Sequence, residues 1–174
     1  MGKKVEGQKL IVREATPAEK DWLYDNKELF SEPYKLIEER RRPEHKCFIL
    51  LKGREIIGYQ AFELGRMGLM GLLGTTKYVS SRGTSLRKGY EGRKLGRFLV
   101  GRVREWINAN GIEYGILAAK KPLAKRFWAK VGFERSNGVQ MHEKDVTIFG
   151  INFKKSKTPP RKTSWPRALG RRRH

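Results

Sequence analysis

The chain has 174 residues, a length that suits one compact domain with some tail left over. Its 39 lysines and arginines outnumber its 18 aspartates and glutamates, so the formal net charge is +21. An excess of this sign and size favours polyanionic partners, nucleic acid first and acidic lipid second. The single cysteine, Cys47, excludes an internal disulfide framework and a cysteine-rich metal site. No apolar run is long enough for a signal peptide or a membrane span, so we expect a soluble protein of a reducing, cytoplasmic compartment.

The first half of the chain predicts a strand, two helices and a hairpin. Residues 9–16 have strand character, and Thr16 followed by Pro17 predicts the start of a helix that continues through residues 18–30. A second helix is expected over residues 34–42. Two apolar runs on either side of residues 52–55, with the sequence KGRE, predict a β-hairpin. The side chains that the first helix offers to the core are Trp22, Leu23, Leu29 and Phe30.

The second half alternates strands and helices. Strand character appears over residues 76–80 and again near Leu86, and a long helix is expected from residue 93 to residue 109. A buried type of strand at 112–119, a short helix over 122–132 and a closing pair of strands over 139–153 follow. This order predicts a single-sheet domain of the α/β or mixed α+β class.

The sequence YEGRKLGRF, which opens at Tyr90, has the features of a loop that holds a phosphate. A strand ends, a glycine-containing turn follows and a helix begins, and the N–H groups of a first helical turn favour an anion. Gly92 and Gly96 would permit close approach of the backbone, while Arg93, Lys94 and Arg97 add positive charge. A solvated basic helix with ordinary glycines explains the same residues, and the local stretch alone does not decide between the two.

The segments that follow extend this pattern. In order, the loop, its helix, the strand at 112–119 and the helix PLAKRFWAKVGFE resemble the acyl-CoA-binding half of the GNAT acyltransferase family. In that family a loop written RGxGxG precedes one helix, and a later helix carries A…FYxxxGF. The opening LIVREATPAEKDWL and the hairpin GREIIGYQAFEL also fit the family's N-terminal half, so the resemblance covers about residues 9–153. The matching residues are Gly92, Leu95 and Gly96 in the loop, and Ala124, Phe127, Gly132 and Phe133 in the later helix.

The resemblance implies a splayed central sheet flanked by helices, with acetyl-CoA or another acyl-CoA as the acyl donor. The pantetheine arm would lie between the strand ending near Leu86 and the strand at 114–119, and the diphosphate would bind N–H groups from residue 93 to residue 97. The reaction would transfer the acyl group to an amine, with a general base and a general acid. The implied cofactor-binding residues are Leu86, Gly92, Arg93, Lys94, Leu95, Gly96, Arg97, Lys121, Phe127 and Trp128.

Four positions depart from the family pattern. Glu91 stands where glutamine or arginine is usual, and its carboxylate would repel a diphosphate unless it were turned away or paired. Lys94 replaces a glycine, and Lys121 replaces the usual asparagine. Trp128 replaces the tyrosine that commonly serves as general acid, and an indole cannot take that role. Either another acid or solvent reprotonates the thiolate, or the fold is retained while the chemistry is changed or lost.

Three residues are the candidates for proton transfer. Glu63, at the end of a predicted strand, is where proteins of this type often keep a general base, although an exposed strand-end carboxylate explains it as well. Tyr90 and Tyr114 are possible proton donors, of which Tyr114 is taken as the candidate catalytic residue, and a role as packing or edge aromatics explains both as well. We expect no metal, because the cluster His142, Glu143 and Asp145 is explained by a charged turn.

The chain divides into a basic extension at 1–8, an acyltransferase-like domain at 9–153 and a basic, disordered tail at 154–174. The tail carries nine cations and no acidic residue, so removing its charge from the total of +21 leaves +12 on the rest of the chain. We interpret it as a nucleic-acid contact rather than a solubility segment. Its candidate contacts are Lys154, Lys155, Lys157, Arg161, Lys162, Trp165, Arg167, Arg171, Arg172 and Arg173.

Three functions fit these observations. The first is an acyltransferase whose acceptor amine is on a nucleic acid or a nucleic-acid-associated macromolecule. The second is a relative that, like Mom-type DNA-modification proteins, alters a nucleic-acid base by less usual chemistry. The third is a non-catalytic module of the same fold that binds RNA, DNA or a ribosome. The sequence indicates neither the acyl group nor the oligomeric state.

Overall fold

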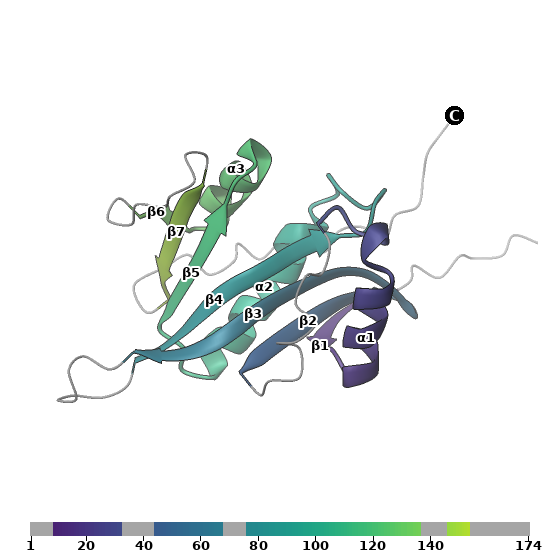
Figure 1. Ribbon diagram of the computed structural model, residues 1–174, viewed down its shortest axis with the longest axis horizontal. Helices are drawn as coiled ribbons and strands as arrows, with labels where there is room; N and C mark the ends of the chain where they lie inside the picture. The colour runs from purple at the N-terminus through teal and green to yellow at the C-terminus, as the bar shows by residue number, and fades with distance from the viewer. Residues whose placement is uncertain (1–8, 33–43, 68–75, 137–145, 154–174) are drawn as a thin grey trace, which may run out of the picture.

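The computed structural model of the protein describes residues 9–32, 44–67, 76–136 and 146–153 (Figure 1). The strands form one seven-stranded sheet in the order β1-β2-β3-β4-β5-β7-β6, in which only β4 and β5 run parallel to each other. The elements are β1 (Leu10–Glu14), α1 (Pro17–Asp25), the 3-10 helix η1 (Lys27–Leu29), β2 (His45–Lys52), β3 (Glu55–Met67), β4 (Thr76–Leu86), α2 (Leu95–Ala109), β5 (Tyr114–Ala119), α3 (Pro122–Lys130), β6 (Glu134–Arg135) and β7 (Thr147–Asn152).

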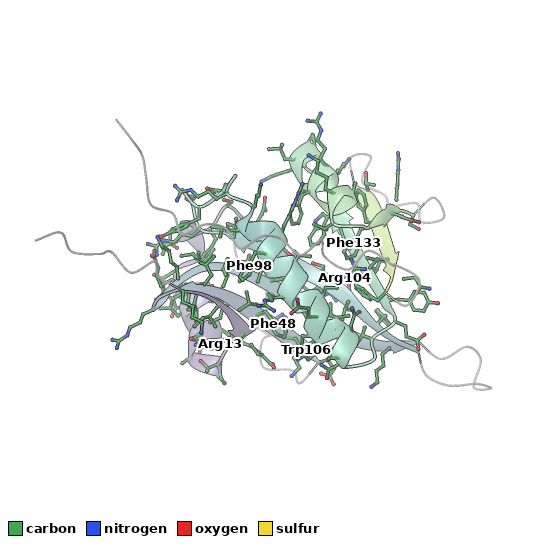
Figure 2. All side chains as sticks on the ribbon, turned by 180° about the vertical axis from the view of Figure 1, so that it is seen from behind. Arg13, Phe48, Phe98, Arg104, Trp106 and Phe133 are labelled. Carbon is green, nitrogen blue, oxygen red and sulfur yellow. The ribbon has the colours of Figure 1, made fainter. Side chains whose placement is uncertain are left out.

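Helix α2 covers one face of the sheet. Its apolar residues recur at helical spacing and pack on Phe48, Ile57 and Phe62 of the central strands. Figure 2 shows α2 lying across the sheet, with Phe48 and Trp106 in the interface between them. Helix α3 lies on the same side, because Trp128 packs with Val100 of α2 and with the inward residues of β5.

Helix α1 covers only part of the opposite face. Leu23 is fully buried and Phe30 nearly so, and both pack on the residues of β2 and β3 that point to this side. Trp22 and Leu29 are partly buried against the same cluster. On this face β5 has no covering helix among the described residues, so Tyr114 and Ile116 stay about 40 % exposed (41 % and 39 %).

The sheet is joined at its centre by a short parallel contact. Tyr78, Val79 and Ser80 of β4 pair with Tyr114, Gly115 and Ile116 of β5, and beyond these three pairs the strands diverge (Figure 1). In β4 the register shifts so that Ala61 pairs with Gly83 and Phe62 with Ser81, which leaves Arg82 as an extra residue, a β-bulge. A bulge bends its strand, and here it lies next to the point of divergence.

These observations confirm the predicted fold class, a mixed sheet flanked by helices. Several boundaries differ from expectation. The first helix stops at Asp25 and continues as η1, β4 is one strand, and α2 begins at Leu95 rather than at residue 93. In addition, β5 begins at Tyr114 rather than at residue 112, and α3 ends at Lys130. The helix expected at 34–42, part of the closing pair at 139–153, and the segments 1–8 and 154–174 lie outside the described residues. Within the described residues no helix is long and apolar enough to cross a membrane.

Candidate active site

The loop between β4 and α2 is built from residues with left-handed backbone conformation. Gly89, Gly92 and Lys94 have φ angles of 86°, 74° and 61°. Glycine takes this conformation without cost, whereas another residue loses about 1–2 kcal/mol. Lys94 is the single non-glycine residue with positive φ in the described parts of the chain. Replacement of the family's glycine by Lys94 has therefore kept the glycine-type backbone.

The first turn of α2 presents N–H groups that no side chain of the described residues caps. Lys94 is the N-cap residue, and its side chain makes no capping hydrogen bond. The first helical hydrogen bond runs from the Phe98 N–H to the Lys94 carbonyl at 3.1 Å, so the preceding N–H groups have no partner inside the helix. With Arg93 and Arg97 beside them, these groups form the kind of helix start that binds phosphate.

The loop is anchored to the turn between β2 and β3. The Glu55 carboxylate accepts hydrogen bonds from the Tyr90 hydroxyl at 2.9 Å and from the Arg87 guanidinium at 2.6 Å. Burial, and then the bond to Glu55, raises the pKa of Tyr90. Tyr90 is thereby held in a loop-fixing contact, which makes its packing role the better supported of its two predicted roles.

The carboxylate of Glu91 is held by two hydrogen-bond donors. Its carboxylate accepts hydrogen bonds from the Ser31 hydroxyl and from the Gly89 N–H, the latter at 2.7 Å. These contacts, the Ser31 bond first, lower the pKa of Glu91. Its negative charge is thus matched by one donor within the loop and one from the segment after η1.

The second helix of the site, α3, contacts the first turn of α2 directly. A Cβ atom on Gly96 would lie 3.4 Å from Cε2 of Phe127, so the missing side chain lets α2 and α3 approach closely. Trp128 is buried, with its ring 5.0 Å from that of Phe127 and 5.1 Å from that of Phe133 between centroids. Trp128 therefore fills the core beside β5 and supplies no ionisable proton.

An ion pair spans the mouth of the gap between β4 and β5. Lys121, two residues after β5, pairs with the carboxylate of Glu32. Glu32 is held on the β4 side, since its N–H donates to the Ser85 hydroxyl at 2.8 Å and its carbonyl accepts from the Tyr59 hydroxyl at 2.8 Å. Burial of Tyr59 raises the pKa of that phenol. Lys121, where the family has asparagine, thus connects the two diverging strands.

A groove of about 1270 Å³ lies over the face of the sheet that α1 leaves open. Tyr78 and Tyr114 are register partners on neighbouring strands, and both line it. The Tyr78 ring lies on Gly65, where a Cβ would overlap it, so the glycine allows the ring to lie flat on the sheet. Ile116 completes an apolar and aromatic floor.

Glu63 stands at the edge of this groove. Its carboxylate accepts hydrogen bonds from the bulged Arg82, one of them from Nε at 3.0 Å. Glu63 is the register partner of Ser80, which in turn pairs with Ile116, while Tyr114 occupies the neighbouring row. The structure therefore brings Glu63 and Tyr114 into one groove, beside the point where β4 and β5 separate.

Arg82 and Tyr78 are site residues that the sequence reasoning missed. Gly83 after Arg82 was a weak signal for a bulge, because glycine inside a strand often marks one. Nothing in the sequence singles out Tyr78, since an aromatic residue is ordinary in a strand.

Two other predicted features fall outside this geometry. Within the described residues no group of histidine, cysteine, aspartate and glutamate could hold a metal. His142, Glu143, Asp145 and the ten tail residues predicted to contact nucleic acid lie outside the part of the chain that the structure describes.

The comparisons with known proteins agree on one family. The model of the acetyltransferase (GNAT) family matches residues 12–133, whereas a comparison with curated protein sequences finds no match. The ribosomal-protein-S18-alanine N-acetyltransferase of Escherichia coli is 11 % identical, with a TM-score of 0.65 over 83 % of this chain and 94 % of that one. Arabidopsis thaliana NAA60 in complex with acetyl-CoA is 13 % identical, with a TM-score of 0.64 over 83 % and 99 %. A Bacillus subtilis acetyltransferase in complex with CoA is 17 % identical, with a TM-score of 0.61 over 83 % and 99 %.

These structural similarities show the fold, and the family model covers more than half of the chain. Acyl-CoA-dependent N-acyl transfer is the general activity of the matched family, and acyl-CoA as cosubstrate fits it. With its splayed sheet and glycine-type loop, the chain belongs to the GNAT acetyltransferase family.

Proposed function

We propose that this protein transfers an acetyl or related acyl group from acyl-CoA to an amine on a nucleic acid or on a nucleic-acid-associated macromolecule. One arrangement carries the proposal. The gap between β4 and β5 has the uncapped start of α2 beside it and the groove with Glu63 on the open face of the sheet. A donor in the gap and an acceptor in the groove would meet where the two strands separate.

The residues around the gap fit an acyl-CoA. The N–H groups of Leu95, Gly96 and Arg97 would hold the diphosphate, and Arg93 adds a guanidinium. Leu86 ends the strand on one side of the gap, and Lys121 follows the strand on the other. Acyl-CoA supplies a thioester whose acyl carbon an amine can attack.

Within this proposal Glu63 acts as the general base, directly or through one water, and removes the proton of the attacking amine. Arg82 orients the carboxylate through its hydrogen bonds. Tyr114 donates a proton to the departing CoA thiolate. Trp128 has no ionisable proton for this role, and the Tyr90 hydroxyl is bonded to Glu55. The groove holds both Glu63 and Tyr114.

The charge of the protein supports an acceptor on or beside nucleic acid. Without the nine cations of residues 154–174, the remaining chain keeps +12 of the total of +21. A polyanion is attracted to such a surface from any direction, and the tail residues named above would add phosphate contacts. Contacts of this kind give affinity and leave the choice of acceptor amine to the groove.

Replacement of Glu63 tests the chemistry. Glu63→Gln should lower kcat/KM for acyl transfer by about 100-fold or more, because general base catalysis contributes that much, while acetyl-CoA still binds by calorimetry. Glu28→Gln, at an exposed carboxylate in η1, is the matched control and should leave the rate unchanged. Equal rates for the two variants would remove Glu63 from the mechanism.

A non-catalytic module is the second candidate, favoured by the placement of Trp128 in the core where the family keeps a titratable tyrosine. Titration with acetyl-CoA separates it from the enzyme, since a module that has lost the chemistry and the coenzyme gives no heat of binding. The base-modifying alternative is tested by mass spectrometry of nucleosides and of proteins after expression of the gene. Modified bases without acylated amines would favour it.

A further inference from the structure

Helix α3 and its first flanking residues carry an excess of positive charge. Between residues 120 and 130 the chain has five cations and no acidic residue: Lys120, Lys121, Lys125, Arg126 and Lys130. The first turn of the helix also has no acidic residue, and its N-cap Lys121 makes no side-chain capping bond. A composition of this kind is not explained by the needs of a helix.

The spacing of these cations opposes helix stability. Arg126 and Lys130 are four residues apart, and like charges at this spacing repel across one turn. Two of the lysines also lie at the positive end of the helix dipole. Repulsion that destabilises a helix is expected on a surface where an anionic partner offsets it.

The outward side of α3 is accessible to such a partner. Leu123, Arg126 and Lys130 are all exposed and lie three and four residues apart, which places them on one stripe of the helix. The apolar side, with Phe127 and Trp128, is packed into the core. Because that side is not free to enter a bilayer, the exposed stripe fits a hydrated polyanion better than an acidic membrane.

The stripe adjoins the coenzyme loop and is separate from it. The contact of Gly96 with Phe127 sets α3 against the start of α2, where Arg93, Lys94 and Arg97 continue the positive charge. The N–H groups discussed above belong to the start of α2, whereas Arg126 and Lys130 are exposed on a different helix. One anion at α2 and a second along α3 can therefore bind together.

We infer that the exposed stripe of α3, with Arg126 and Lys130 as its cationic contacts, binds the phosphodiester backbone of a nucleic acid. This inference rests on the proposed function, because it gives the acceptor macromolecule a docking surface beside the coenzyme. The contacts are to phosphates, so they supply affinity and orientation without a preference for sequence.

Salt dependence of binding gives the test. The full-length protein and its variants are titrated into a fluorescent 20-base-pair DNA duplex and into a single-stranded RNA between 50 and 200 mM salt. The variant Arg126→Gln/Lys130→Gln should lower the slope of log K against log salt by about 1.8 on the duplex, since each lost phosphate contact removes about 0.9. On the single strand the expected loss is about 1.4, from about 0.7 for each contact.

The control carries the same charge change elsewhere. Lys9→Gln/Lys27→Gln removes two exposed cations next to β1 and in η1, and it should keep the wild-type slope. Equal slopes for the two double variants would overturn the inference, because net charge or other segments would then explain binding. A loss of affinity for phosphatidylserine vesicles with none for nucleic acid would overturn it in favour of an acidic lipid.

The proposed function is tested separately, by calorimetry with acetyl-CoA on the wild type and on the two double variants. Binding of acetyl-CoA by all of them, together with the loss of slope in the α3 variant, supports both proposals. If the wild type binds no acetyl-CoA and the slope still falls, the acyltransferase proposal fails and the docking surface stands. Far-ultraviolet circular dichroism confirms that each variant is folded.

Discussion

At the scale of single residues, the phosphate loop shows how a family pattern can lose a glycine and keep its geometry. Lys94 takes the left-handed conformation that the glycine would have had, with φ of 61°. The steric cost of this conformation falls on Lys94 alone, because lysine has a Cβ atom. The backbone that the diphosphate would recognise is retained, while a mobile ammonium group is added beside it.

Replacement of this lysine by glycine should stabilise the protein. For Lys94→Gly we expect the free energy of unfolding to rise by about 1 kcal/mol or less, because relief of strain is partly offset by the greater freedom of glycine in the unfolded chain. Urea unfolding measures the change. Lys94→Ala removes the same ammonium but retains a Cβ, so a similar gain for both variants would show that the charge, not the conformation, is the cause.

Other residue-scale features could be anticipated only as alternatives. The sequence shows Glu91 in the loop, but its bond to Ser31 depends on residues sixty positions apart meeting in space. The loss of a titratable group at Trp128 could be read from the sequence, whereas its burial beside β5 needed the structure. Arg82 as the partner of Glu63 follows from a register shift that the sequence signals only weakly, through Gly83.

At the scale of elements, the N-terminus of α1 is stabilised by a capping box and by hydrogen bonds from Arg13. The Thr16 hydroxyl accepts a hydrogen bond from the Glu19 N–H, and the Glu19 carboxylate accepts one from the Thr16 N–H at 2.9 Å. Arg13 of β1 donates two further bonds to the same carboxylate, at 2.8 and 2.6 Å. The bond to Arg13, with smaller effects of Thr16, lowers the pKa of Glu19 to about 2.

This capping box should make part of the stability depend on pH. The pKa of Glu19 falls from 4.5 to about 2 on folding, so its contribution is complete above pH 4.5 and is lost as the pH falls toward 2. Glu19→Gln should cost about 1 kcal/mol of unfolding free energy at pH 7, and the difference from wild type should shrink between pH 4.5 and pH 2. Urea unfolding at pH 7 and pH 3 measures both values, with Glu28→Gln as the control. A difference that stays constant over this range would contradict the assignment.

The element pattern was the most predictable part of this fold. The hairpin around KGRE and the start of α1 follow from turn and capping chemistry, which acts within a few residues. The predicted start of α2 lies two residues too early. Lys94 adopts a left-handed backbone conformation that is unusual for a lysine, so the sequence gives no sign of it. The groove could not be predicted, since it depends on which part of one sheet face α1 leaves uncovered.

At the scale of the whole molecule, positive charge is spread over the folded body and is not confined to the tail. The chain without residues 154–174 still has +12, and α3 holds five of the cations in eleven residues with its flank. Long-range attraction by such a body acts on the rate of association more than on the choice of partner, and it weakens within about 10 Å at 0.1 M salt. The composition predicted this property directly, whereas its concentration on one exposed helix depends on the core packing of Phe127 and Trp128.

The three-pair contact between β4 and β5 has a consequence for cooperativity. The antiparallel halves of the sheet, β1–β4 and β5–β7, share a seam much shorter than the ten pairs that join β3 to β4. A coenzyme lying along both strands would bridge the halves and bind only the folded chain. At a concentration of 100 times its Kd it should raise the free energy of unfolding by about 2.7 kcal/mol, measurable as a higher Tm in differential scanning calorimetry. In the absence of the coenzyme, hydrogen exchange should then be fastest along the seam, so occupancy of the site would decide whether the sheet melts as one unit or two.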